Sequence, residues 1–528
     1  MKKLLAILLA VSLLAVALAG VAALAENSSS GNMNEAGDPP AMPEGENGQP
    51  GDAPEKPDGD VGGGMGQPGD APEKPDGEMG GMGDAPGGDM GGTPGGMGGG
   101  SSQPESYDAV NTFSESTTLT GEAIESTGKD ENAVLVVSGD TVLSDVTITR
   151  ESADSTGGDN ASFYGVGACV LVTGGSVEIN ESAITSDADG AAGVFAYGDG
   201  VATVNDTVIH TSGNTAGGIH VAGGGTLYAN SLEVTTEGES SAAIRSDRGS
   251  GTMRVNGGTY TSNGTGSPAV YVTADIAINN AVLTATGSEA LCLEGKNSVA
   301  LYDCALYGDM NDDGQNDNTW TVILYQSMSG DSEIGEGRFE MNGGSLTSAN
   351  GGLFYTTNTT SEFVLTAVDI TAAEDCEYFL RCTGNSNARG WGSAGSNGAD
   401  CAFTAIAQRM DGDILWDSIS ELDLYVTGGS VLTGAVLQDE SCVTVAGSGY
   451  CHVNIDAGST WVVTADSALT RLTCEGSIVD ADGNAVTVLG TDGTVYREGT
   501  SAVTVTVGSY SAVCDLSGAG TATDWVAG

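Results

Sequence analysis

The chain has 528 residues, 83 of them glycine, and carries 71 Asp and Glu against 16 Lys and Arg, a formal net charge of −55 at pH 7. This acidity excludes a surface that follows nucleic-acid phosphates and argues against adsorption to anionic membranes, because both need a basic face. At this length we expect either several domains or a repeat architecture.

Residues 1–25 have the pattern of a secretory signal peptide. Lys2 and Lys3 precede an apolar run over residues 4–18, and Ala-Leu-Ala at 23–25 fits a cleavage site. We therefore expect a secreted or cell-surface protein, with no membrane insertion once the signal is cleaved. The alternative is an uncleaved N-terminal anchor, because the apolar run is nearly long enough to span a bilayer.

Residues 26–106 form an acidic stretch rich in Gly, Pro and Met. The segment QPGDAPEKPDG occurs at 49–59 and again at 67–77. Few β-branched or aromatic side chains are available for burial, so the stretch cannot offset its ordering entropy. We predict a disordered linker that extends by charge repulsion.

Ten cysteines begin at Cys169. In an exported chain they permit disulfides, and the pairs closest in sequence are Cys292/Cys304, Cys376/Cys382 and Cys442/Cys451. The alternative is that several, Cys169 first, are small buried hydrophobic residues within strands.

A repeat of about 25 residues begins near residue 133. Alternating segments start at residues 193, 218, 243, 269 and 290, and continue at 321, 352, 377 and 413 after longer insertions. Each repeat holds two more short alternating segments, with Gly, Asn, Ser or Thr between them. Three short strands per repeat are typical of one rung of a parallel β-helix, which buries its apolar face by stacking on its neighbours. An antiparallel sandwich is the structural alternative, but it would not keep one phase through nine repeats.

The alternation predicts two columns of inward-facing side chains. The first column is Val194, Ile219, Ile244, Val270, Leu291, Val322, Leu353, Tyr378 and Ile414. The second column is Ala196, Val221, Ser246, Val272, Leu293, Leu324, Tyr355, Leu380 and Trp416.

Stretches such as SAAIRSDRGSGTMRVNGGTYTSNGTGSPAVYVTADI and LEGKNSVALYDC resemble secreted right-handed parallel β-helix proteins of Gram-positive anaerobic bacteria, in the pectate-lyase-like superfamily. The resemblance covers about residues 107–510 and points to a non-catalytic, carbohydrate-binding or adhesin-like subgroup. It implies an all-β fold, a right-handed parallel β-helix solenoid after a disordered leader. Members of this superfamily include lyases, hydrolases and binding proteins, so the fold does not decide the function.

The residues between the two inward columns are expected to face solvent and to form a ladder. The predicted glycan-binding set is Phe195, Tyr197, His220, Arg245, Tyr271, Glu294 and Tyr325. Rungs stack about 4.8 Å apart, so an extended sugar chain could lie along this face. Aromatic rings would stack on sugar faces while charged groups bond hydroxyls or carboxylates. The alternative is an ordinary solvated surface.

An enzymatic alternative is a Ca²⁺-dependent lyase or a glycoside hydrolase acting on acidic polysaccharide. For a lyase, Arg245, Asp247 and Glu294 supply a base and metal-binding carboxylates. The signature motifs expected of either branch are absent, which favours a non-catalytic protein.

The segment DMNDDGQND resembles a calcium-binding loop. Asp309, Asn311, Asp313 and Asp317 occupy positions 1, 3, 5 and 9, with Gly at position 6. Position 12 is Trp320 in place of the bidentate Glu, and strands rather than helices flank the loop. The alternatives are a weak Ca²⁺ site and an acidic turn inserted between rungs.

These patterns predict a parallel β-helix over residues 107–476 and a C-terminal hairpin cap over 477–528. The expected function is adhesion or binding of an extracellular polysaccharide or a host or cell-surface glycan, by a monomer. A purely structural surface-layer element is the remaining alternative.

Overall fold

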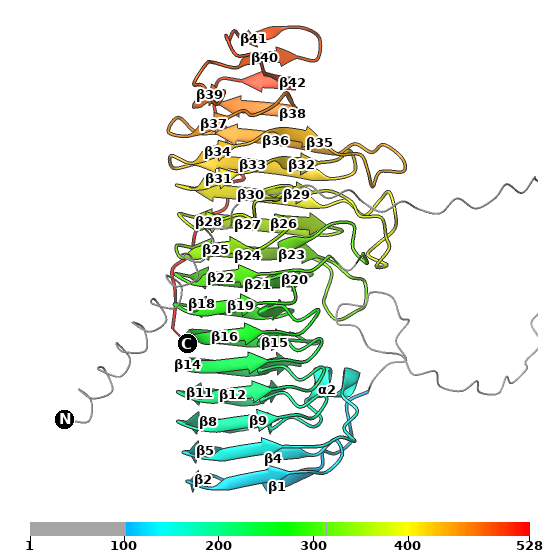
Figure 1. Cartoon of the computed structure of the whole chain (residues 1–528), viewed down its shortest axis with the longest axis vertical. Helices are drawn as coiled ribbons and strands as arrows, with labels where there is room; N and C mark the ends of the chain where they lie inside the picture. The colour runs from blue at the N-terminus through cyan, green and yellow to red at the C-terminus, as the bar shows by residue number, and fades with distance from the viewer. Residues whose placement is uncertain (1–101, 313, 528) are drawn as a thin grey trace, which may run out of the picture. The chain divides into compact units, whose positions relative to one another are not determined.

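The repeat winds the chain into a parallel β-helix (Figure 1). The computed structural model describes residues 102–312 and 314–527. The predicted signal peptide and residues 26–101 of the predicted linker lie outside the described residues. No helix within the described ranges is long and apolar enough to span a bilayer.

The first strand of each rung belongs to a thirteen-stranded parallel sheet within the described residues. Its strands, in order, are β1 (Ala109–Phe113), β4 (Asn132–Val136), β7 (Val170–Val172), β10 (Val194–Tyr197), β13 (Ile219–Ala222), β15 (Ile244–Ser246), β17 (Val270–Val272), β20 (Leu291–Glu294), β23 (Trp320–Tyr325), β26 (Gly352–Thr357), β29 (Leu380–Cys382), β32 (Ile414–Trp416) and β35 (Val436–Gln438). We call this sheet the first stack.

The second strands stack in the same way. They are β2 (Thr117–Thr120), β5 (Asp140–Ser144), β8 (Ser176–Asn180), β11 (Val201–Asn205), β14 (Thr226–Thr236), β16 (Thr252–Ser262), β18 (Asp275–Asn279), β21 (Ser298–Tyr302), β24 (Glu336–Asn342), β27 (Thr360–Thr366), β30 (Asp400–Ile406), β33 (Glu421–Thr427), β36 (Tyr450–Ile455) and β38 (Ser467–Cys474). Strands β14 and β16 run on into the third stack.

The third stack completes each rung. Its strands are β3 (Ala123–Ser126), β6 (Thr147–Arg150), β9 (Ala183–Ser186), β12 (Val208–Thr211), β19 (Val282–Ala285), β22 (Ala305–Gly308), β25 (Ser345–Ser348), β28 (Asp369–Thr371), β31 (Arg409–Asp411), β34 (Val431–Thr433), β37 (Thr460–Val462) and β39 (Ser477–Val479). The last four form a separate small sheet. A single short helix, α2 (Gly158–Tyr164), is inserted between β6 and β7 in the described chain.

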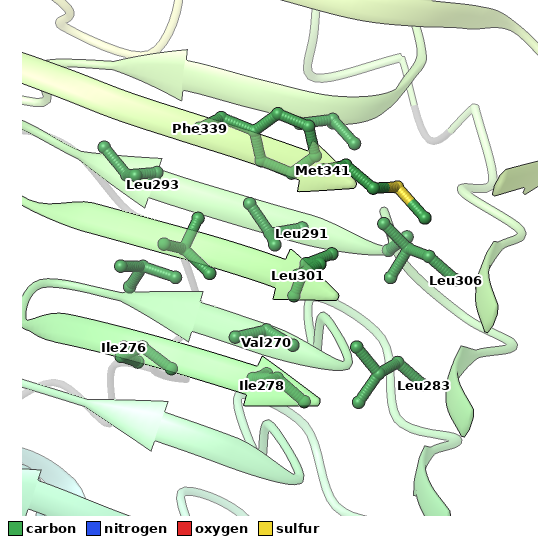
Figure 2. Close-up of a cluster of buried hydrophobic side chains, with 14 of the residues drawn as sticks. Val270, Ile276, Ile278, Leu283, Leu291, Leu293, Leu301, Leu306, Phe339 and Met341 are labelled. Carbon is green, nitrogen blue, oxygen red and sulfur yellow. The ribbon is translucent and has the colours of Figure 1, made fainter. Parts of the chain in front are cut away.

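The core is the space that the three stacks enclose. Side chains such as Leu291, Leu301 and Leu306, from the three strands of one rung, converge there (Figure 2). The predicted first column is confirmed from Val194 to Val322 by direct pairing of each residue with the next. Burial of such columns is the main favourable term in folding.

The predicted inward columns are wrong at β26 and β29 and are confirmed again at β32, where Ile414 pairs with Leu380 and Trp416 with Cys382. Val322 pairs with Phe354, which pairs with Leu380, so the first column passes through these residues rather than through Leu353 and Tyr378. Tyr355 and Tyr378 pack in a cluster outside the solenoid core. Three large apolar or aromatic side chains, Leu353, Phe354 and Tyr355, are consecutive in β26, so the phase of its sequence GLFYTT cannot be assigned from alternation.

In several rungs, one corner turns through a single left-handed residue. The asparagines that precede these residues form a ladder, in which Asn205 Nδ2 donates to Asn180 Oδ1 and Asn230 Nδ2 to Asn205 Oδ1, both at 2.8 Å. The positive φ falls on the following residue, 47° at Glu181 and 46° at Asp206. Asparagine stacking therefore repeats this turn in these rungs, whereas paired left-handed glycines make the corners at residues 257–258, 343–344 and 428–429.

At the C-terminal end, β39 still pairs in parallel with β37. Strands β40 (Thr487–Gly490) and β41 (Val495–Arg497) form an antiparallel hairpin, and β42 (Thr504–Ser511) pairs with β38. Residues 512–527 then run back beside earlier rungs, where Trp525 packs on Tyr302 with ring centroids 5.8 Å apart (Figure 1). We call residues 512–527 the tail.

All ten cysteines lie in the described residues and are free thiols. The three disulfides that the sequence left open are therefore not formed in this structure. Seven of the ten are buried, Cys169 among them, as expected for small apolar residues in strands.

Candidate functional site

Four insertions cover the outer face of the first stack between β13 and β26. They are residues 151–169, which include α2, and the loops 309–319, 326–335 and 383–399. Together with the strands they enclose a cavity of about 390 Å³. We call this space the cavity. The outer face of these rungs is therefore a covered hollow rather than the flat, solvated ladder that the sequence predicts.

Acidic and aromatic side chains dominate the cavity wall. Its carboxylates are Asp159, Glu239, Asp247, Glu289, Glu294 and Asp331, and the guanidinium groups of Arg245 and Arg389 also line it. Its aromatic rings are Phe163, Tyr271, Trp320, Tyr325 and Trp391. Rings that bury an apolar face beside a few placed polar groups are typical of small-molecule sites.

Asp247 is the centre of a buried charged group at one end of the cavity. Its Oδ2 lies 2.7 Å from Arg245 Nε and 2.9 Å from His220 Nε2. Arg245 also donates to Ser162 Oγ of α2 at 2.8 Å and to the Ser240 carbonyl. Burial opposes ionisation of Asp247, but the Arg245 charge and the His220 hydrogen bond outweigh it and lower the Asp247 pKa.

Glu294 lies at the end of β20 and is 1% exposed. Its Oε2 accepts from Tyr271 Oη at 3.1 Å and from Tyr325 Oη at 3.3 Å, while Oε1 accepts from the backbone N and the hydroxyl of Ser327. Burial raises the Glu294 pKa, and the Asp331 charge adds to the rise although the Ser327 bond opposes it. The site thus holds two carboxyl groups whose pKa values are pushed in opposite directions.

The register sets the spacing of these two carboxyl groups. Arg245, Tyr271 and Cys292 pair directly across β15, β17 and β20. Asp247 follows Arg245 by two residues, and Glu294 follows Cys292 by two residues. Asp247 and Glu294 therefore lie two rungs apart. At about 4.8 Å per rung their backbones are about 10 Å apart along the solenoid.

The loops over the cavity are tied to one another. Arg248 Nη2 lies 2.6 Å from Asp331 Oδ1, and its guanidinium lies 4.1 Å from the centre of the Phe163 ring, which joins α2 to the 326–335 loop. Trp391, from the 383–399 loop, packs on Tyr325 with centroids 4.6 Å apart. Helix α2 is thus joined to the 326–335 loop, and the 383–399 loop is joined to β23.

The predicted glycan-binding residues divide into two groups. Arg245, Tyr271, Glu294 and Tyr325 line the cavity, as does Asp247. The other three residues, Phe195, Tyr197 and His220, do not line it. Phe195 is 0% exposed and stacks on the His220 ring at 4.1 Å, and Tyr197 packs on Tyr164 of α2 at 5.8 Å. The solvent exposure predicted for this set is wrong for Phe195 and His220, which α2 and its flanking residues cover. It is also wrong for Glu294 and Tyr325, which are buried in the cavity wall.

The loop predicted to bind Ca²⁺ lies between β22 and β23. Asp309 Oδ1 accepts from Asn350 Nδ2 at 2.8 Å, and Asp317 Oδ2 accepts a backbone N–H of the 383–399 loop at 2.7 Å. Asn311 lines the cavity, and Asp313 lies outside the described residues. Among the described residues, those of this loop included, no three His, Cys, Asp or Glu side chains are grouped to hold a metal ion. Calcium binding stays a prediction.

The insertions contribute cavity residues that the repeat pattern did not identify. Three of these residues lie in the insertions: Phe163, Met310 and Trp391. The fourth, Trp320, is the first residue of β23 and precedes the alternating positions. Two features of the sequence pointed to these residues. The repeat lengthens at the insertions, and one of the five tryptophans occurs in the glycine-rich segment RGWGS.

Comparison with known proteins assigns no family to this cavity or to this chain. No protein-family model matches the sequence, and no curated protein matches it. The functional inference therefore depends on the parallel β-helix and on the residues that line the cavity.

Proposed function

We propose that this is a secreted, surface-displayed β-helix protein of the pectate-lyase-like kind from a Gram-positive anaerobe, and that it acts in adhesion by binding a carbohydrate in the cavity. A volume of about 390 Å³ is within the range of small-molecule sites, about 300–1,000 Å³. The supporting observation is one enclosed space in which the rings of Tyr271, Trp320 and Trp391 meet carboxylates and hydroxyls from successive rungs.

Sugars suit such a wall because they have both apolar C–H faces and hydroxyls. Aromatic rings bury the apolar faces, and carboxylates accept hydrogen bonds from the hydroxyls. Because insertions cover the ladder, the bound portion is a chain end or a short oligosaccharide rather than a long run of sugars along the face.

Glycan-array and calorimetric binding of the Trp391→Ala variant test this proposal. Loss of the ring that packs on Tyr325 should weaken sugar binding at least tenfold, since a well-packed aromatic anchor contributes about 2 kcal/mol or more. The matched control is Trp525→Ala, which removes a tryptophan that packs on Tyr302 away from the cavity. Equal binding by both variants and the unsubstituted protein would remove the cavity as the sugar site.

The opposite pKa shifts of Asp247 and Glu294 support a second candidate, glycoside hydrolysis. A carboxyl held protonated can give its proton to the leaving oxygen, while an ionised carboxylate activates water or stabilises positive charge. A lyase is supported less well, because Arg245 already donates to Asp247, Ser162 and Ser240 and is poorly placed to accept a proton.

Release of reducing ends from a panel of neutral, acidic and amino-sugar oligosaccharides tests hydrolysis. Glu294→Gln should abolish any turnover and leave sugar binding within a few fold, whereas Glu233→Gln, at an exposed position of β14, should change neither. If no oligosaccharide of the panel is hydrolysed but sugar binding is retained, the hydrolase candidate is wrong and non-catalytic binding is the remaining function.

A further inference from the structure

Two cysteines flank the base of the 383–399 loop. Cys382 ends β29 and is the last residue before the loop, and Cys401 is the second residue of β30, which follows it. Both side chains belong to the solenoid core and are 0% and 2% exposed. The loop carries Trp391, which packs on Tyr325 at the cavity. A bond between the two cysteines would therefore close the base of a loop that covers the cavity.

The register places the two thiols together. Cys382 pairs with Thr356 of β26, one rung earlier. Cys401 pairs with Ser361 of β27 in the same way. The hydroxyls of Thr356 and Ser361 are buried and hydrogen-bonded to each other at 2.9 Å. Because side chains in paired positions point the same way from rung to rung, the two sulfur atoms take the places that two touching hydroxyls take in the rung before.

The contacts of the Cys382 sulfur agree with this placement. It lies 4.0 Å from the Ala399 carbonyl oxygen and 3.7 Å from the Glu421 carbonyl oxygen. Ala399 comes two residues before Cys401, and Glu421 pairs with Asp400, the residue just before Cys401. The sulfur therefore lies beside the start of β30. Burial raises the pKa of the Cys382 thiol well above its usual value, and the interaction with the Cys401 side chain adds to the rise.

Two other cysteines near this point are less well placed. Cys451 lies on the same column as Cys401, but Leu422 comes between them, so their backbones are two rungs, about 10 Å, apart. A disulfide needs Cα atoms within about 7 Å of each other. Cys376, the partner that sequence spacing suggests for Cys382, donates instead to a backbone carbonyl two residues further on. Cys401 is therefore the partner that the geometry favours.

We propose that Cys382 and Cys401 form a disulfide in the secreted protein, and that this bond holds the 383–399 loop over the cavity. The inference uses the secretion proposed above, because disulfides form and persist in an oxidising extracellular setting. It does not depend on which ligand the cavity binds.

The oxidation needs an electron acceptor, whose class is a disulfide: a small-molecule disulfide or that of a thiol–disulfide oxidoreductase. One cysteine thiolate attacks this disulfide and releases a thiol, and the second cysteine attacks the resulting mixed disulfide and releases the other. The two cysteines thus lose two electrons and two protons, and the acceptor becomes two thiols. Because the folded rung holds Cys382 as a buried, neutral thiol, the bond should form while the rung is folding and be protected afterwards.

Non-reducing peptide mapping of the full chain tests the proposal. The protein is collected after export to an oxidising compartment, its free thiols are alkylated, and it is digested with trypsin without reduction. Cleavage after arginine places Cys382 on peptide 382–389 and Cys401 on peptide 390–409, while Cys376 stays on the preceding peptide. We expect the first two peptides to be joined by a bond that reduction breaks.

Hydrogen exchange measures what the bond does to the loop. In Cys401→Ser, and in the reduced unsubstituted protein, backbone amides of 383–399 should exchange at least several-fold faster than in the oxidised protein. Serine suits this place because the rung before holds two hydroxyls there. The matched control is Cys304→Ser, at another buried core cysteine whose thiol donates to backbone carbonyls as a hydroxyl can. This control should keep both the linked peptides and the slow exchange.

The outcomes separate this inference from the proposed function. Unlinked peptides, or Cys382 joined to Cys376, overturn the disulfide and leave carbohydrate binding intact. Equal exchange of the loop in oxidised and reduced protein overturns its role in holding the loop. Linked peptides together with no binding on the glycan array support the disulfide and overturn the carbohydrate function.

Discussion

His220 and Asp247 illustrate how this fold buries polar residues at a site. The solenoid register places His220 directly beside Phe195 on one side and Arg245 on the other. Burial lowers the His220 pKa from 6.5 to about 4, although its hydrogen bond to Asp247 acts in the opposite direction. The imidazole is therefore neutral in the folded protein at neutral pH, and Asp247 is held ionised by Arg245.

This depressed pKa predicts a pH dependence of stability. The unfolded chain binds a proton at His220 below about pH 6.5, while the folded protein does so only below about 4, so stability falls as the pH drops between these values. A difference of about 2.5 pKa units corresponds to roughly 3 kcal/mol. Chemical unfolding from pH 7 to 4 should show this loss, and His220→Gln should remove it.

His210→Gln is the matched control, since His210 is exposed on β12. Its unfolding free energy should follow that of the unsubstituted protein at every pH. A His220→Gln curve parallel to that of the unsubstituted protein would show that His220 is not buried in its neutral form.

At the scale of elements, the insertions rather than the strands define the cavity. Helix α2 has only seven residues, and its Phe163 packs beneath the Arg248 guanidinium that also pairs with Asp331. This three-residue contact is the clamp between α2 and the 326–335 loop. A cation over a ring and one partly buried ion pair each contribute about 1 kcal/mol.

Removal of the clamp should loosen both covering elements. In Arg248→Ala, backbone amides in 158–164 and 326–335 should exchange with solvent at least several-fold faster, and the cavity ligand should dissociate faster. Hydrogen exchange read by mass spectrometry measures this, with Arg409→Ala as the control because Arg409 is 74% exposed on its side chain. Unchanged exchange in the two segments would show that the clamp does not hold them.

The 309–317 loop carries the calcium prediction. If it binds Ca²⁺ with the weak affinity typical of extracellular sites, about 0.1–1 mM, then 10 mM Ca²⁺ should stabilise the protein by about 1–3 kcal/mol. Thermal unfolding with Ca²⁺ and with chelator measures the effect. The double variant Asp309→Asn, Asp317→Asn should lose it, and a Ca²⁺ response that survives in this variant would place the ion elsewhere.

At the scale of the whole molecule, the tail connects distant rungs. Gly520 N donates to Thr404 Oγ1 at 2.8 Å, and the backbone N and hydroxyl of Thr523 both bond Glu340, which is 1% exposed. Arg338, on the same strand as Glu340, donates to the tail carbonyl of Thr521. The tail thus supplies partners for a buried carboxylate about 180 residues earlier in the sequence.

Deletion of residues 512–528 should therefore destabilise the middle of the solenoid rather than its C-terminal end. Glu340 would lose its two Thr523 bonds, at a cost of about 1–3 kcal/mol, and β24 should become more susceptible to proteolysis. Limited proteolysis and thermal unfolding measure this, with deletion of residues 526–528 as the control. Cleavage confined to β40–β42 would contradict the prediction.

The sequence predicted the rungs well because stacking is a local rule repeated many times. Each rung buries apolar side chains at the same positions as its neighbours, so spacing and alternation identified the first column from Val194 to Val322. They also identified five residues that line the cavity: Arg245, Asp247, Tyr271, Glu294 and Tyr325. The pattern failed at β26, where Leu353, Phe354 and Tyr355 are consecutive and alternation disappears. It also could not say what lies over an outward-facing residue.

By itself, the sequence determined the parallel β-helix and the residue types that face outward on each rung, because both follow from period and alternation. Only the tertiary structure decided that α2 and three loops fold over that face, since their positions depend on contacts such as Arg248 with Asp331 and Trp391 with Tyr325 between segments far apart in the chain. These segments turn a ladder into a partly covered, acidic cavity, and α2 and its flanking residues remove Phe195 and His220 from solvent. Such contacts have no period, so no repeat in the sequence reports them.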